Sequence, residues 1–219
     1  MINKEVTKRI LSSLILIPLA IFFVIKGNFL FNFFILICFF ITSYEWHKMS
    51  RRKSYYLLGL IFLFFSFYSA YEIRTHMSDG YEYFIIILLI CISTDIGGYF
   101  FGKIFKGPKL TKISPKKTFS GAIGGYLLSI IFFNLVLNSN YFLNEPIKIT
   151  FDIFLFILLI STVSQLGDII ISYFKRLSKI KDTGKIIPGH GGLLDRIDGM
   201  IFAYPFAYLT FKMNTFQYF

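Results

Sequence analysis

The sequence is poor in charged residues and in cysteine. Only 16% of its 219 residues are charged, whereas an ordinary soluble domain has about 25%. The two cysteines, Cys38 and Cys91, both lie inside apolar runs. This placement argues against a disulfide framework, and it also argues against a cysteine-based metal site, which needs clustered ligands.

Apolar residues dominate the chain instead. Hydrophobic residues make up 55% of it and aromatic residues 20%, including 29 phenylalanines. A soluble fold of this length has too little interior to bury so much apolar surface, and disordered chains are poor in apolar residues. We therefore predict an all-α polytopic membrane protein.

Seven apolar segments are candidates for membrane-spanning helices, although several are shorter than the about 20 residues that a perpendicular helix needs. They are residues 10–25, 29–44, 55–71, 83–101, 121–137, 151–171 and 199–211. The first segment has no small-x-small cleavage site and leads directly into the second, so we do not expect a cleaved signal peptide. We predict a single membrane domain over residues 1–219, with N-terminal helices in 1–82 and the chemical motifs in 83–219.

The basic residues are divided unevenly between the segments that join these spans. All but four of the 23 Lys and Arg residues precede the first span or follow the second, fourth and sixth spans. The exceptions are Lys26, Arg74, Lys148 and Lys212. By the positive-inside rule, this pattern predicts a cytoplasmic N-terminus, an odd number of spans and cytoplasmic loops that carry the charge.

Two acids lie well inside predicted spans, away from the first residues of the span, and both are near the cytoplasmic ends. A charge in hydrocarbon costs at least about 2.5–3.5 kcal/mol, so Asp95 and Asp168 are expected to face a polar cavity. The rise of a helix places both within about 10 Å of that end. The alternative is an interhelical hydrogen bond or ion pair that only builds the bundle.

The segment after the sixth span has the highest density of polar signals. Gly189, Gly191 and Gly192 flank His190 directly after Pro188. This composition predicts an irregular turn whose backbone N–H groups can approach a ligand closely. His190 has no second His or Cys beside it, so we do not interpret it as a zinc ligand, and it could instead make a local hydrogen bond in the turn.

Asp195 and Asp198 are three residues apart just before the last span, so on a helix they share a face. With Asp168 they form a carboxylate set that we predict to bind Mg²⁺, alone or with a second cation. Acids, a metal and clustered cations together are typical of phosphoryl and nucleotidyl transfer. The surrounding cations are Lys175, Arg176, Lys181 and Arg196.

The segment after the fourth span contains Ser114-Pro115-Lys116-Lys117-Thr118. Its two lysines are predicted to hold an anionic substrate, and the alternative is further orientation charge. The glycines that follow, Gly121, Gly124 and Gly125, predict close helix packing.

Together these motifs resemble those of the bacterial phosphatidate cytidylyltransferases, also called CDP-diacylglycerol synthases. The matching residues of the main signature are Ser172, Lys175, Arg176, Lys181, Asp182, Gly184, Pro188, Gly189, His190, Gly191, Gly192, Asp195, Arg196 and Asp198. The segments around Asp95, Ser114 and Asp168 also resemble the family. In contrast, Lys103 stands where the family more often has Arg, and Ser120 where it often has Glu.

The resemblance implies transfer of the cytidylyl group from CTP to phosphatidic acid, giving CDP-diacylglycerol and pyrophosphate in phospholipid biosynthesis. It also implies a multi-pass protein of the cell (inner) membrane, a homodimer and no nucleic-acid partner. The predicted catalytic residues are Asp168, Asp195 and Asp198, which are also the predicted metal ligands, with Lys175, Arg176 and Arg196. The predicted substrate-binding residues are Asp95, Ser114, Lys116, Lys117, Lys181, Asp182, His190, Gly191 and Gly192.

Two other classes remain as alternatives. A CDP-alcohol phosphotransferase-like lipid enzyme would share the start Asp195-x2-Asp198-Gly199, but Phe202 and Ala203 stand where its Ala and Arg should be, and no Asp follows. A transporter of anionic metabolites would place its site near the membrane midplane between repeated halves. The acids lie near one face instead, and the sequence shows no repeat.

Overall fold

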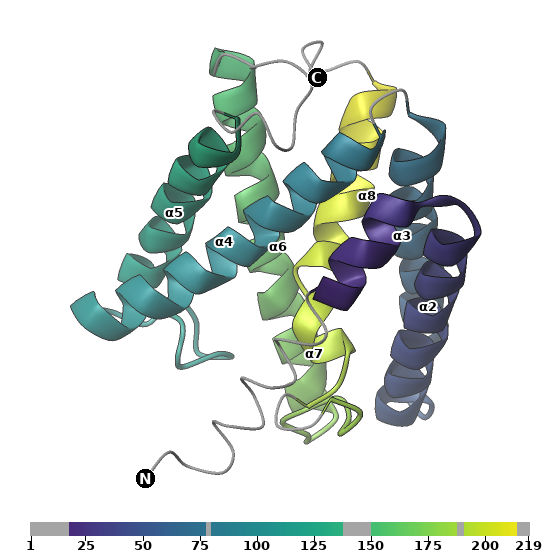
Figure 1. Cartoon of the computed structure of the whole chain (residues 1–219). Coiled ribbons are helices and arrows are strands. Elements are labelled where there is room, and N and C mark those ends of the chain that lie inside the picture. Colours follow the sequence, from purple (N-terminus) through teal and green to yellow (C-terminus); the bar gives the residue numbers. More distant parts are fainter. Residues whose placement is uncertain (1–17, 78–79, 138–149, 188–190, 214–219) are drawn as a thin grey trace, which may run out of the picture.

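The computed structural model describes residues 18–77, 80–137, 150–187 and 191–213, and this part of the chain is helical without a β-strand. Residues 18–26 are helical. The following helices are α2 (Asn28–Ser50), α3 (Tyr56–His76), α4 (Gly80–Phe105), α5 (Phe119–Leu137), α6 (Phe151–Leu177), α7 (Leu194–Ile197) and α8 (Met200–Lys212). Figure 1 shows them packed as one bundle.

Four of these helices, α2, α3, α4 and α6, are long and apolar enough to cross a membrane, and α5 contains a shorter apolar stretch. The all-α polytopic class is therefore confirmed. Each predicted span after the first corresponds to a helix. Most of the first span, before residue 18, lies outside the described residues, so the count of seven stays a prediction.

The ends of α6 carry the polar residues that a helix favours there. The Thr150 hydroxyl accepts a hydrogen bond from the Ile153 N–H at 3.3 Å, and Asp152 lies in the first turn. Lys175 and Arg176 lie in the last turn, where the helix dipole favours cations. These features extend α6 beyond its apolar part and place two predicted site residues at its end.

The pair α4 and α5 packs closely because small residues line the contact. A Cβ atom built on Gly97 would lie 2.4 Å from the carbonyl oxygen of Gly124, so no larger residue fits at this crossing. The close packing predicted for Gly121 and Gly124 is thus confirmed. It fixes the helix that carries Asp95 against the helix that begins beside Lys117.

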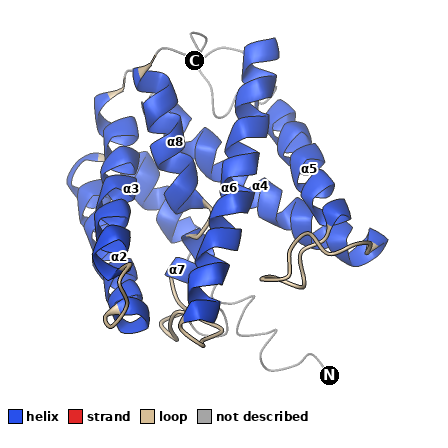
Figure 2. Cartoon of the chain, turned by 180° about the vertical axis from the view of Figure 1, so that it is seen from behind, coloured by secondary structure: helices blue, strands red, loops and turns tan. Residues whose placement is uncertain are grey.

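Three connections lie at the same end of the bundle. They are the turn between α2 and α3, the loop between α4 and α5, and the described residues between α6 and α7, as Figures 1 and 2 show. All three carry basic residues. The structure therefore groups three of the four basic segments that the charge pattern places on one side, while the fourth, at the N-terminus, lies outside the described residues.

An apolar cluster joins the N-terminal helices to this end of the bundle. Its buried members come from α2, α3, α6, α7 and α8: Trp46, Met49, Leu63, Ile171, Leu194 and Ile201. A buried hydrogen bond from the Ser66 hydroxyl to the carbonyl oxygen of Ile201, 2.6 Å long, adds a polar tie between α3 and α8.

Candidate active site

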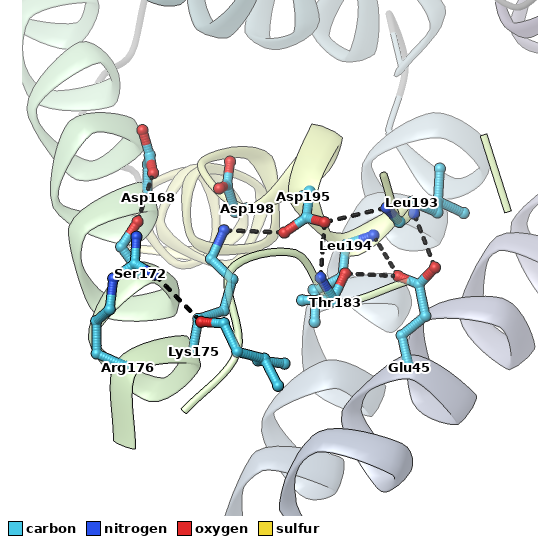
Figure 3. Close-up of polar contacts among 12 residues, drawn as sticks. Glu45, Asp168, Ser172, Lys175, Arg176, Thr183, Leu193, Leu194, Asp195 and Asp198 are labelled. Atoms are coloured by element: carbon cyan, nitrogen blue, oxygen red, sulfur yellow. Dashed lines mark hydrogen bonds and ion pairs between the residues drawn. The ribbon is translucent and has the colours of Figure 1, made fainter. Parts of the chain in front are cut away.

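Asp195 is a carboxylate at this end of the bundle with hydrogen bonds to both of its oxygens (Figure 3). Its Oδ1 accepts a hydrogen bond from Lys175 Nζ at 2.9 Å, and its Oδ2 accepts from the backbone N–H groups of Thr183 at 2.8 Å and Gly192 at 3.0 Å. The ion pair is buried, with 10% of the Lys175 side chain and 5% of the Asp195 side chain exposed. Asp195 therefore ties the loop after α6 to α6 itself.

The environment of Asp195 favours its charged form. Burial alone would raise the pKa of this carboxyl, but Lys175 and the two backbone N–H groups outweigh burial and hold the pKa below its ordinary value. A lowered pKa means that the carboxylate stabilises the fold at neutral pH, and that this contribution is lost as the pH falls through the pKa.

Asp198 and Asp168 form a second group of acids. Asp198 follows α7 and is 7% exposed, and its Oδ1 accepts a hydrogen bond from the Gly199 N–H at 3.0 Å. Burial and the neighbouring Asp168 carboxylate raise the pKa of Asp198, and Asp95 acts in the same direction. These three acids are therefore within electrostatic range of one another, as the sequence predicts.

Lys117 reaches this group from the loop before α5. Its Nζ lies 2.5 Å from Asp168 Oδ2, while Asp168 Oδ1 accepts a hydrogen bond from the Ser172 hydroxyl at 3.2 Å. The loop is folded by the bond from the Leu110 N–H to the Lys117 carbonyl oxygen, 2.8 Å long. A backbone bond from Lys117 to the Ser114 carbonyl oxygen forms the turn that precedes α5.

The other predicted site residues lie around these two groups. Arg176 is exposed and donates to the carbonyl oxygen of Ile180 at 3.2 Å. Five further predicted site residues are exposed: Asp95, Lys116, Lys181, Asp182 and Arg196. Gly191 forms an isolated β-bridge with Ile187. His190 lies outside the described residues, so its predicted role has no structural counterpart here.

The predicted three-carboxylate metal set is not gathered in the structure. Within the described ranges, no three His, Cys, Asp or Glu side chains form a group that could hold a metal ion. Lys175 and two backbone N–H groups already occupy the oxygens of Asp195. Asp168 and Asp198 still fit a magnesium ion in their chemistry, because Mg²⁺ is commonly bound by one or two carboxylates together with water and phosphates.

One buried acid of the site escapes the sequence prediction. Glu45, on α2, is 1% exposed. Its Oε1 accepts from the Leu193 N–H at 3.0 Å, and its Oε2 accepts from the Leu194 N–H at 2.8 Å and the Thr183 hydroxyl at 3.1 Å. An acid that directly follows an apolar run is the signal that could identify Glu45, but the predicted span ends at residue 44.

The backbone passes very close to this carboxylate. A Cβ atom on Gly192 would lie 2.6 Å from both Glu45 carboxylate oxygens and 2.2 Å from the Thr183 hydroxyl oxygen. Gly192 is therefore required because the loop passes so close to Glu45. This packing requirement holds whether or not Gly192 also contacts a ligand.

Apolar helices long enough to cross a membrane, with carboxylates and ammonium groups gathered at one end of the bundle, fit an integral-membrane enzyme that acts on phosphates. The chain belongs to the cytidylyltransferase family, whose model matches residues 7–71 and 54–214. The resemblance drawn from the motifs is thereby confirmed.

Proteins named phosphatidate cytidylyltransferase are similar to it over most of its length. The one from Rickettsia felis is 36% identical over 217 residues, which cover 93% of this chain and 91% of the relative. The one from Rickettsia conorii is 38% identical over 199 residues, covering 88% of this chain and 85% of the relative. The one from Staphylococcus aureus strain COL is 40% identical over 149 residues, covering 68% of this chain and 53% of the relative.

Proposed function

We propose that this protein transfers the cytidylyl group of CTP to phosphatidic acid, giving CDP-diacylglycerol and pyrophosphate. Its family and the names of its relatives support this activity. The structural observation that carries the proposal is the pairing of acids with lysines at the basic end of an apolar bundle: a partly buried pair, Lys117 with Asp168, and a buried pair, Lys175 with Asp195.

The reaction needs little covalent help from the protein. A phosphate oxygen of phosphatidate attacks the α-phosphorus of CTP, and the bond from that phosphorus to the oxygen of the leaving pyrophosphate breaks. Phosphatidate is ionised near neutral pH, since the second pKa of a phosphate monoester is about 6, so no strong general base is required. The task of the site is to orient two anions and to offset their charge.

The basic residues divide this task by position. Lys117 and Lys175 stand beside the acids, whereas Lys116, Lys181, Arg176 and Arg196 have exposed side chains that can meet phosphates arriving from solvent. Asp168 and Asp198 would bind Mg²⁺. A bound divalent ion would offset charge that develops on the triphosphate.

The proposed orientation places this end of the bundle in the cytoplasm, in a multi-pass protein of the cell (inner) membrane with seven spans. CTP then arrives from the water phase, and phosphatidate arrives from the membrane leaflet. Asp168 lies nine residues before the end of α6, which is about 14 Å along the helix axis, so a site there can serve both substrates. A homodimer, implied by the resemblance, remains part of the proposal.

The direct test uses purified protein, phosphatidate, Mg²⁺ and CTP labelled in the cytosine ring. We expect label to enter the lipid extract only when both substrates are present. A CDP-alcohol phosphotransferase would require CDP-diacylglycerol and an alcohol instead, and a transporter would leave all label in the water phase. Absence of lipid-extractable label from the folded wild-type protein would refute the proposed activity.

The Lys117→Met variant tests the basic loop. The ammonium group of Lys117 lies 2.5 Å from Asp168 Oδ2. We expect the loss of this ammonium group to lower kcat/KM by about 10²-fold, as for other groups that stabilise developing charge. Lys53→Met is the control, since Lys53 is exposed in the turn between α2 and α3 at the same end. Equal effects of the two variants in the transfer assay would contradict a specific role for Lys117.

A further inference from the structure

Glu45 is a buried acid for which the proposed chemistry has no use, and its hydrogen-bond partners lie in the loop after α6 and at the first residue of α7. These partners are Thr183 near the start of the loop and the backbone N–H groups of Leu193 and Leu194 near its end. Glu45 itself belongs to α2, far away in the sequence. Figure 3 shows its carboxylate facing this loop on the side away from Asp168 and Lys175.

Glu45 and Asp195 bind the same two stretches of backbone. At Thr183, the N–H donates to Asp195 and the hydroxyl donates to Glu45. At the other stretch, the Gly192 N–H donates to Asp195 and the next N–H, that of Leu193, donates to Glu45. Each end of the loop is therefore held between two carboxylates, one from the N-terminal helices and one from the signature segment.

We propose that Glu45 is a positioning residue for the transfer reaction. By fixing Thr183 and Gly192, it holds the two N–H groups that orient Asp195, and through Asp195 it holds the Lys175 ammonium group in place. The N-terminal helices thus take part in shaping the site, although none of the predicted site residues lies in them. This inference rests on the proposed function, because its readout is cytidylyl transfer.

The chemistry of a carboxylate explains why a glutamate is needed at this position. The two carboxylate oxygens of Glu45 accept hydrogen bonds from three donors. A glutamine amide has only one acceptor oxygen, and its NH₂ group is itself a donor that cannot accept from the N–H and O–H groups around it. Glu45→Gln therefore keeps the size of the side chain but leaves at least one buried donor without an acceptor. A buried donor without an acceptor is unfavourable, so the loop is expected to shift.

The position of Glu45 predicts which kinetic constant changes. Glu45 reaches the reacting groups only through the loop, and a misplacement of about 1 Å can cost about 10²-fold in rate. We expect Glu45→Gln to lower kcat by about 10²-fold while the KM for phosphatidate stays near the wild-type value, because an interaction needed in the transition state has been weakened.

Ser66→Ala is the matched control. Ser66 is also buried, and its hydroxyl also joins an N-terminal helix to the C-terminal part of the chain, through the Ile201 carbonyl oxygen. Both variants are expected to lower the unfolding temperature of the purified protein, but only Glu45→Gln is expected to lower kcat. An equal loss of kcat in Ser66→Ala would overturn the inference, because general loosening of the bundle would then explain the effect.

Thr183 supplies a second, milder test that does not depend on the folding of the Glu45 variant. Thr183→Val removes only the hydroxyl that donates to Glu45, and Thr183→Ser retains it. We expect a lower kcat for Thr183→Val and recovery for Thr183→Ser. In the double variant with Glu45→Gln, the losses should not multiply, since both changes break one shared contact.

The outcomes separate this inference from the proposed function. A folded wild-type protein without transfer activity overturns the proposed function. An active wild-type protein with wild-type kcat in Glu45→Gln, or with fully multiplicative losses in the double variant, overturns the positioning role alone.

Discussion

The Asp168→Asn variant is expected to lose about 10³-fold in kcat while keeping its fold. Asn has the shape of Asp and can still accept the hydrogen bond from Ser172, but it is neutral and cannot form the ion pair with Lys117. Asp168 is also, with Asp198, the best-placed candidate to bind Mg²⁺. Asp168 acts on the anionic transition state only through the cations it holds, Lys117 and the proposed Mg²⁺. Weakening one cation that stabilises developing charge costs about 10²–10³-fold, and a weaker metal site adds to this.

Two measurements distinguish this role from a structural one. The transfer assay reports kcat, and the binding of Mn²⁺ to the protein without substrates, followed by electron paramagnetic resonance, reports the metal site directly. We expect both to weaken in Asp168→Asn. Asp152→Asn, in the first turn of the same helix and therefore at its other end, should leave both unchanged. Wild-type turnover in Asp168→Asn would remove Asp168 from the proposed site.

The sequence predicts the helices well because hydrocarbon-facing segments need apolar residues, but it misplaces their ends. Helix α2 continues to Ser50 and α6 to Leu177, beyond the predicted ends at residues 44 and 171. In both cases the last turns are polar and leave the apolar region, where hydropathy no longer reports on helix formation. The missed turns matter, because they carry Glu45 and Lys175.

The sequence also predicts which residues gather at the site, but it does not predict which acid pairs with which lysine. Acids within apolar runs identify Asp95 and Asp168, and the signature identifies Asp195 and Asp198. That Asp195 pairs with Lys175, while Asp198 lies within electrostatic range of Asp168, follows from the path of the loop after α6, which no spacing rule gives. Asp195 and Asp198 are only three residues apart at α7, and they still interact with different side chains.

The Asp195→Asn variant is expected to lose activity and also stability. The motif alone predicts a variant that folds normally, but the structure shows Asp195 paired with Lys175 in a buried site. Breaking such a pair by removing one partner costs about 3–5 kcal/mol, because the remaining charge is left buried without compensation. Since a whole domain is stable by only about 5–15 kcal/mol, the unfolding temperature should fall clearly.

The double variant Asp195→Asn with Lys175→Met separates the two losses. Replacing Lys175 by a neutral side chain of similar length removes the uncompensated ammonium group, so most of the lost stability should return. Transfer activity should not return, because the oriented ammonium group and the carboxylate are both gone. Thermal unfolding in detergent and the lipid-extraction assay, applied to the same preparations, measure the two properties side by side. If the double variant is no more stable than Asp195→Asn, the buried charge pair is not what Asp195 contributes to folding, and its two backbone hydrogen bonds to the loop must account for the loss.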